Sequence, residues 1–179
     1  MAALEITTYG NPILRKKAEE VKFVDKEILK IIEDMKETLI VQGGIGLAAP
    51  QVGISKKIFI VDLPTDKGSK KIVLLNPKII FYSKEKITTE EGCLSFPDVW
   101  GNVERSKKVR VKGKLLSVKP TVIAGEDLLA RVIQHEIDHL EGKLFIDYFS
   151  KEDLEKNKEK LEAIVNQNRE KFRNVELWI

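Results

Sequence analysis

Hydrophobic residues recur at helical spacing in the first quarter of the chain. The stretch begins after Asp25, a residue type that favours the N-cap position, and it ends at Gly43-Gly44. Its apolar positions lie mostly three or four residues apart: Ile28, Ile31, Ile32, Met35, Leu39 and Ile40. The pattern therefore predicts a helix whose apolar side packs on the core.

Two more stretches toward the C-terminus predict helices of different character. Leu128 to Glu141 is strongly apolar, which is typical of a helix that is mostly buried. The stretch from about Lys151 to Phe172 carries only a narrow apolar stripe on a surface rich in Lys and Glu. Ser150 and Asp153 resemble a capping box at its start, which supports a helix beginning there.

Between these helices, hydrophobic residues alternate or cluster in short runs that indicate β-strands. The predicted strands cover 57–63, 72–81, 84–89, 103–112 and 115–123. Turns are expected at 64–68 and 112–114, and the chain is expected to loop through Trp100-Gly101. Asn76-Pro77 should mark a bend or an edge position. Residues 4–24 are expected to be irregular, and 44–53 to form a loop that leads into a short helix.

These elements predict an α+β fold with antiparallel or mixed β-sheets. The sheets should pack around the central helix at 128–141, with one further helix near each end of the chain. A chain of 179 residues is large enough for a sizeable core, so we expect a single domain over residues 1–179.

Composition and charge narrow the possible partners. The net charge of +3 is too small to argue for nucleic acid, so no DNA partner is expected. No run approaches the 18 apolar residues of a membrane span, and the first residues do not resemble a secretory signal. The single cysteine cannot form an internal disulfide, which fits a reducing compartment. We therefore expect a cytoplasmic protein without a membrane partner.

Candidate chemistry lies in the central predicted helix, in His135-Glu136-Ile137-Asp138-His139. Residues i and i+4 of a helix share one face, so both imidazoles can bind one metal ion while Glu136 reaches a water on that metal. This H-E-x-x-H pattern also occurs by chance, usually on a solvated helix face. The apolar flanks argue against that alternative, and so does the histidine count of two, because both lie in the pattern.

A catalytic metal site of this kind usually has a third protein ligand. The metzincin pattern is excluded, because Phe145 stands where the third histidine is required. Thermolysin-like enzymes use a later glutamate, and the candidates Glu155, Glu159 and Glu162 lie on the solvated C-terminal helix. Cys93, the only thiol, remains as the preferred third ligand beside His135 and His139.

Three segments together resemble the motifs of the bacterial peptide deformylases. They are residues 44–51 (Gly-Ile-Gly-Leu-Ala-Ala-Pro-Gln), 91–95 (Glu-Gly-Cys-Leu-Ser) and 134–140 (Gln-His-Glu-Ile-Asp-His-Leu). They occur in the family's order and with similar spacing, and the resemblance spans residues 5 to about 150. The helical C-terminus is similar to that of the common bacterial subtype.

The resemblance implies the reaction and its cofactor. The family removes the N-formyl group from the N-terminal formylmethionine of newly synthesised proteins and releases formate. Cys93, His135 and His139 would bind Fe(II), with Zn, Ni or Co able to substitute, and Glu136 would act as general acid and base on a metal-bound water. The expected partners are N-formylmethionyl peptides of nascent chains, with a possible transient ribosome contact.

The resemblance also implies roles for residues that touch the substrate. The side-chain amide of Gln51 and the backbone N–H of Leu94 would stabilise the oxyanion. The Ile45-Gly46 backbone would pair with the peptide like an added strand, and Gly92 would also contact the substrate.

The methionine pocket and its surroundings include one departure from the family pattern. Leu128 and Val132 are expected to help form the pocket, and Arg105 to pair with Glu91 and hold the cysteine loop. Arg131 stands beside this pocket, where an apolar residue is often found. Further departures are Pro50 and the absence of a basic residue in the 98–101 loop.

Two other functions remain possible from the sequence. The chain could be a zinc-dependent peptidase that cleaves internal bonds, or a non-catalytic protein with a structural Cys-His-His metal. A structural metal site is usually closed by four protein ligands. This chain offers three ligands and a carboxylate, Glu136, that need not bind the metal, which argues against a structural site.

Overall fold

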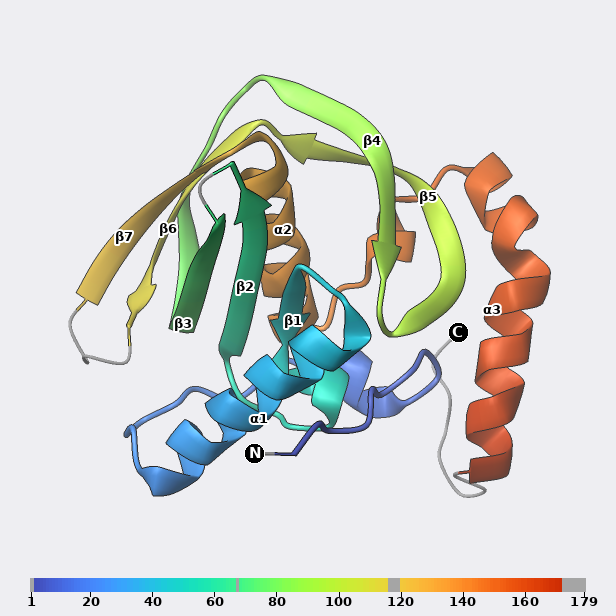
Figure 1. Ribbon diagram of the computed structural model, residues 1–179. Helices are drawn as coiled ribbons and strands as arrows, with labels where there is room; N and C mark the ends of the chain where they lie inside the picture. Colours follow the sequence, from blue (N-terminus) through green and yellow to red (C-terminus); the bar gives the residue numbers. More distant parts are fainter. Residues whose placement is uncertain (1, 67, 116–119, 172–179) are drawn as a thin grey trace.

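The computed structural model describes residues 2–66, 68–115 and 120–171, which form two antiparallel β-sheets and three α-helices (Figure 1). The helices are α1 (Lys26–Gln42), α2 (Asp127–Leu140) and α3 (Lys151–Lys171). The strands are β1 (Gly46–Ala48), β2 (Ile58–Thr65), β3 (Gly68–Tyr82), β4 (Lys86–Cys93), β5 (Phe96–Ser106), β6 (Lys108–Lys114) and β7 (Pro120–Glu126). Short 3-10 helices lie at Pro12–Arg15, Ala49–Val52 and Phe145–Tyr148. The predicted α+β class is confirmed.

Local hydrogen bonds explain where the helices begin and end. The Asp25 side chain accepts a hydrogen bond from Ile28 N–H at 2.9 Å, and Gly43 ends α1 in the left-handed region at φ 65°. The Ser150 hydroxyl accepts from Asp153 N–H at 3.0 Å, so the predicted cap of α3 is present. Phe172, the expected last residue of that helix, lies outside the described residues. No described helix has the length and apolar content that would cross a membrane.

The larger sheet has the strand order β1-β2-β3-β6-β7, and α2 packs on one of its faces. Phe59, Val61, Leu74, Val109 and Val111 from the sheet are buried together with Ala130 and Ile133 from α2. Helix α1 covers β1 and β2 through a second buried cluster. The larger sheet therefore supports α2, the helix that carries the candidate residues His135, Glu136 and His139.

The smaller sheet is a long hairpin of β4 and β5 that packs against α2 and α3. Its register pairs Glu91 with Gly101 and Gly92 with Trp100, and the chain turns between Cys93 and Phe96. Figure 1 shows this hairpin arching from the far end of the larger sheet toward α3. The hairpin thereby brings the single cysteine, at the end of β4, back beside α2.

The predicted strand limits were wrong in this hairpin. The prediction ended a strand at Thr89 and placed Trp100-Gly101 in a loop, whereas β4 continues to Cys93 and β5 runs from Phe96 to Ser106. The predicted strand 103–112 is two strands in different sheets, with a break at Lys107. These segments contain Glu, Gly and Asn and lack a clear alternation, so backbone pairing across the hairpin decides their conformation.

Several shorter predictions also need correction. The segment 112–114 is not a turn, because β6 continues to Lys114. The predicted strand 115–123 overlaps β7 only from Pro120, and 116–119 lie outside the described residues. Gly46–Ala48 is an edge strand rather than loop. The bend at Asn76 is present, with φ 49° at a register shift, but it lies in the interior strand β3.

Candidate metal centre

Three side chains from two elements converge beside the hairpin turn. Cys93 ends β4, and His135 and His139 lie one turn apart on α2. One ligand atom from each lies within 4.8 Å of the other two, and Cys93 Sγ is 3.2 Å from Nε2 of His139. Among the residues that the structure describes, these three form the one group of His, Cys, Asp or Glu side chains whose ligand atoms are close enough together to hold a metal ion.

The two histidines differ in the direction of their pKa shift. Burial lowers the pKa of His135, but hydrogen bonds with Cys93 and Glu91 outweigh burial and raise it well above the ordinary value, so a metal would replace a proton there. His139 is 1% exposed, and burial together with the charges of His135 and Arg105 lowers its pKa well below the ordinary value. A neutral imidazole has a free lone pair, which is the form that binds metal. The alternative ligands Glu155, Glu159 and Glu162 are exposed on α3 and do not belong to this group. A thiol and two imidazoles thus form the donor set.

Glu136 lies between the two histidines and is almost fully buried. Burial raises the pKa of its carboxyl to about 7; the charge of His135 lowers this pKa by a smaller amount, and the charge of Glu91 raises it. Its Oε2 atom has no hydrogen-bond partner among the described residues. A carboxyl with this pKa can accept and release a proton near neutral pH.

Gly46 on β1 lies directly against this carboxyl. A Cβ atom added at Gly46 would collide with Oε1 of Glu136 and would lie 2.8 Å from Cγ1 of Val132. Any larger residue would therefore displace Glu136 or α2. The edge strand and the candidate proton carrier are in contact only because position 46 has no side chain.

Gln51 is held so that its amide nitrogen faces the thiol. Its Oε1 accepts a hydrogen bond from Ala48 N–H at 2.8 Å, and its Nε2 donates to Cys93 Sγ at 3.4 Å. The first bond fixes which end of the amide points toward the site. Gln51 is 1% exposed, so the donor is preorganised by its surroundings. Leu94 follows Cys93 in the turn between β4 and β5.

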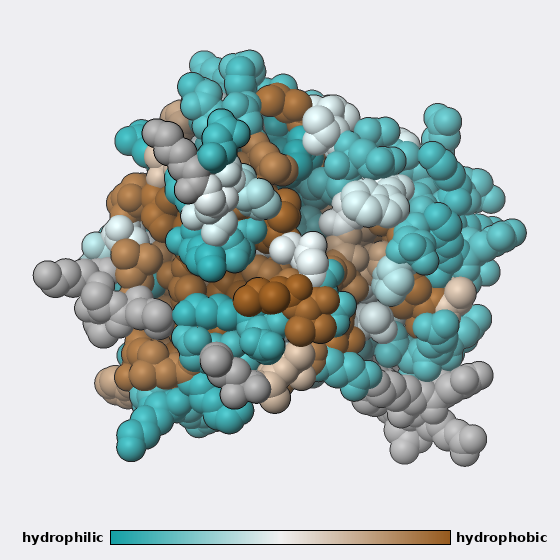
Figure 2. All heavy atoms as spheres, in the orientation of Figure 1, coloured by the Kyte–Doolittle hydropathy of each residue, from teal (hydrophilic) through white to brown (hydrophobic). Residues whose placement is uncertain are grey.

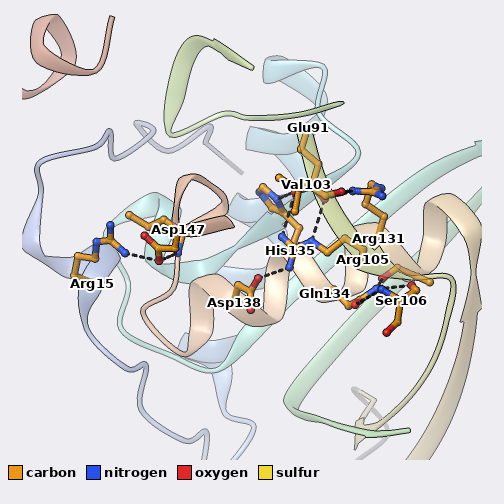
Figure 3. Close-up of polar contacts among 12 residues, drawn as sticks. Arg15, Glu91, Val103, Arg105, Ser106, Arg131, Gln134, His135, Asp138 and Asp147 are labelled. Atoms are coloured by element: carbon orange, nitrogen blue, oxygen red, sulfur yellow. Dashed lines mark hydrogen bonds and ion pairs between the residues drawn. The ribbon is translucent and has the colours of Figure 1, made fainter. Parts of the chain in front are cut away.

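The Glu91 carboxylate lies behind His135 at the centre of a buried ionic network (Figure 3). It accepts hydrogen bonds from Nδ1 of His135 at 3.0 Å and from Arg105 at 3.0 and 3.2 Å. Burial raises the pKa of Glu91, but these bonds outweigh burial and lower it to about 2. Arg105 also donates to Asp138 of α2 and lies 4.7 Å from the centre of the Tyr148 ring. Glu91 can thus orient the candidate ligand His135 from the side of its Nδ1 atom.

Arg131 joins the same network, which the sequence did not reveal. Position 131 looked like a departure in the wall of a side-chain pocket. The side chain lines that cavity, but its guanidinium donates to Glu91 Oε1 at 2.6 Å and to the carbonyls of Val103 and Ile87 at 2.8 and 2.6 Å. The Arg131 guanidinium is therefore hydrogen-bonded to the β4–β5 hairpin, both to the Glu91 side chain and to two backbone carbonyls.

A cavity of about 660 Å³ opens beside the converging side chains. The candidate residues that line it are Ile45, Gly46, Gln51, Glu91, Gly92, Cys93, Leu94, Leu128, Val132, His135 and Glu136. Trp100 forms part of the wall and covers Gly92, where a Cβ would lie 2.7 Å from its ring. Figure 2 shows hydrophobic residues gathered in the middle of this face, with a mostly hydrophilic region to their right.

The sequence comparisons agree with this geometry. The profile of the polypeptide deformylase family matches residues 3–155. A peptide deformylase of Desulforudis audaxviator is 44% identical over 147 residues, which are 82% of this chain and 94% of the relative. One of Syntrophobacter fumaroxidans is 49% identical over 148 residues, covering 82% of this chain and 86% of the relative.

The fold comparison extends to solved structures. The crystal structure of peptide deformylase 1B of Arabidopsis thaliana with a bound inhibitor superposes with a TM-score of 0.89. The two chains are 36% identical, and the match covers 95% of this chain and 94% of the plant chain.

Proposed function

The chain belongs to the polypeptide deformylase family, and we propose that Cys93, His135 and His139 hold its catalytic metal while Glu136 carries the proton. It is a hydrolase that removes the formyl group from N-formylmethionyl peptides and releases formate. One observation carries the residue assignment. Both histidines and the only cysteine place ligand atoms within 4.8 Å of one another, next to a buried carboxyl.

The donor set fits a catalytic divalent metal. Thiolate and imidazole are suitable ligands for Fe(II) and Zn(II), and three protein ligands leave a position open. We propose Fe(II) as the native metal, with Zn, Ni or Co able to substitute. When bound, the metal polarises the formyl oxygen and lowers the pKa of a water molecule.

Glu136 and its neighbours would move the proton and stabilise the developing charge. With a pKa of about 7, Glu136 can take a proton from the attacking water and then donate it to the leaving amine. The Gln51 amide and the backbone N–H of Leu94 would donate to the oxyanion. The bond from Ala48 N–H to Gln51 supports this role, because it leaves the Gln51 nitrogen directed at the site.

The cavity would bind the first residues of the peptide. Strand β1 is an edge strand, so the Ile45-Gly46 backbone would pair with the extended peptide. Gly92, Leu128 and Val132 would surround the methionine side chain, because they line the cavity beside Glu136. Glu91 and Arg105 would hold His135 and the cysteine turn in place.

The setting of the reaction follows from the substrate. N-formylmethionine is the first residue of newly made bacterial chains, so we propose that the enzyme works in the cytoplasm on nascent chains. A transient ribosome contact is part of this proposal. We also propose that residues 1–179 form one deformylase domain.

A direct assay separates this function from the two alternatives. Metal-loaded protein is incubated with formyl-Met-Ala-Ser and with unformylated peptides, and formate and peptide fragments are quantified. We expect formate and intact Met-Ala-Ser, with Glu159→Gln on the exposed face of α3 as a control that retains activity. Cleavage of internal bonds would indicate a peptidase, and full metal occupancy without either reaction would indicate a structural site.

A further inference from the structure

Arg131 is a buried arginine whose three polar contacts lie on two neighbouring strands, β4 and β5. It is on α2, and its side chain is 10% exposed. Nη1 donates to Glu91 on β4 at 2.6 Å and to the Val103 carbonyl on β5 at 2.8 Å. Nη2 donates to the Ile87 carbonyl on β4 at 2.6 Å. One planar group thus links the helix that bears both histidines to both strands of the hairpin that bears Cys93 (Figure 3).

Arg131 supplies one of the two permanent cations of this network; His135, which also donates to Glu91, is neutral when it binds a metal. Glu91 and Asp138 supply two carboxylates, and Arg105 and Arg131 supply two guanidinium groups. Without Arg131, the two carboxylates would face one permanent cation. An uncompensated buried charge is strongly unfavourable, so the network would rearrange.

The hydrogen bonds also determine how the Glu91 carboxylate is oriented toward His135. Glu91 Oε1 accepts from Arg105 and Arg131, and Oε2 accepts from Arg105 and His135. Loss of the Arg131 bond would leave Oε1 with the longer of its two contacts, so that Arg105 and His135 alone would hold the carboxylate. The acceptor that orients the His135 ring would then be less firmly fixed.

We propose that Arg131 is a positioning residue that fixes Glu91 against His135 and holds the β4–β5 hairpin against α2, thereby setting the geometry of the three metal ligands. The proposal rests on the metal site assigned above. The planar fork of arginine is essential to it, because lysine would keep the charge but cannot direct donors at three acceptors in one plane. Arg131 also lines the cavity, while its guanidinium is hydrogen-bonded to the hairpin.

The test compares Arg131→Lys and Arg131→Met with Arg110→Met. Arg110 is an exposed arginine on β6 that lies 4.9 Å from the centre of the Phe81 ring. Arg110→Met therefore makes the same substitution at a position outside the Glu91 network. Zinc release from folded protein to a chelator is followed, together with the visible absorption of cobalt-loaded protein. We expect Arg131→Met to release zinc about 10–100-fold faster and to shift the cobalt spectrum. Arg131→Lys should deviate in the same direction, and Arg110→Met should match the unmodified protein.

Kinetics and stability then separate positioning from simple support of the fold. Loss of the guanidinium contacts should lower kcat by about tenfold or more through the metal ligands. Because Arg131 also lines the cavity, a change in KM does not count for or against positioning, and zinc release and the cobalt spectrum decide. Lower thermal stability with unchanged zinc release and an unchanged cobalt spectrum would overturn the proposal. If Arg131→Met does not fold, Arg131→Lys decides by the same readouts. The chelator and spectral measurements use no substrate, so they can fail independently of the deformylase assignment.

Discussion

Gly46→Ala is expected to reduce turnover strongly while leaving the protein folded. Gly46 has no positive φ, so alanine can adopt its backbone conformation and the effect is steric. The new Cβ would collide with Glu136 Oε1 and lie 2.8 Å from Cγ1 of Val132. The register of β1 with Val61 and the burial of Val132 hold both backbones in place, so the Glu136 carboxyl is the group that must move.

The size of the effect follows from these contacts. Overpacking of this kind lowers the free energy of unfolding by about 1–3 kcal/mol. A displacement of the Glu136 carboxyl by about 1 Å would lower kcat on the order of 10²-fold, because proton transfer depends on its position. The metal content should remain stoichiometric, since neither Gly46 nor Glu136 is a ligand in this account.

Gly113→Ala provides a matched control. A Cβ at Gly113 would lie 2.7 Å from the Leu74 side chain in the core beneath β6, away from the cavity. Formate release, metal content and urea unfolding are measured for both variants. Equal stability loss with a kcat loss only in Gly46→Ala supports the reasoning. Near-normal turnover in Gly46→Ala, or an equal loss in Gly113→Ala, would refute it.

Three further predictions concern the ligands and their surroundings. Cys93→Ser should lower metal occupancy, because a hydroxyl is a poor substitute for thiolate; full occupancy measured by metal analysis would return the later glutamates as candidates. Iron-loaded enzyme should lose activity in aerated buffer with oxygen added to Cys93 by mass spectrometry, whereas the zinc-loaded form should persist; equal decay with unmodified Cys93 would point to unfolding or metal loss. The third concerns acid. Because the pKa of Glu91 is lowered from 4.5 to about 2, its contribution to stability, about 3 kcal/mol, is present above pH 4.5 and lost as pH falls toward 2. Urea unfolding of the metal-free protein should therefore show a gap between Glu91→Gln and the unmodified protein that closes over this range, and a constant gap would contradict it.

The sequence predicted the helices well because their signals are local. The cap at Asp25, the ending at Gly43 and the Ser150 cap each depend on residues within one turn of the helix. The three motifs likewise identified the family, because their residues and spacing are specific. The strands of the hairpin could not be predicted in the same way. Glu90 to Trp100 mixes acidic, glycine and apolar residues without a regular alternation, and its extended form depends on pairing across the hairpin.

The burial of several polar side chains was the other feature that could not be predicted from the sequence. Arg131 stands in an apolar helix, and its partners on β4 and β5 lie 28 to 44 residues away in the chain. Asn157 and Asn168 are buried on α3, whose composition predicts a solvated surface, because they hydrogen-bond Trp100 O and the backbone of Tyr9. Such residues are identified only by partners that tertiary structure brings to them.

Glu136→Gln tests the central claim most directly. Glutamine keeps the size of the side chain and cannot act as a general base, and Glu136 is not a metal ligand in this account. Metal content and formate release from formyl-Met-Ala-Ser are measured on the same preparation, with Glu159→Gln as control. The account predicts stoichiometric metal and a loss of kcat on the order of 10² to 10⁴. Near-normal turnover with stoichiometric metal would contradict it.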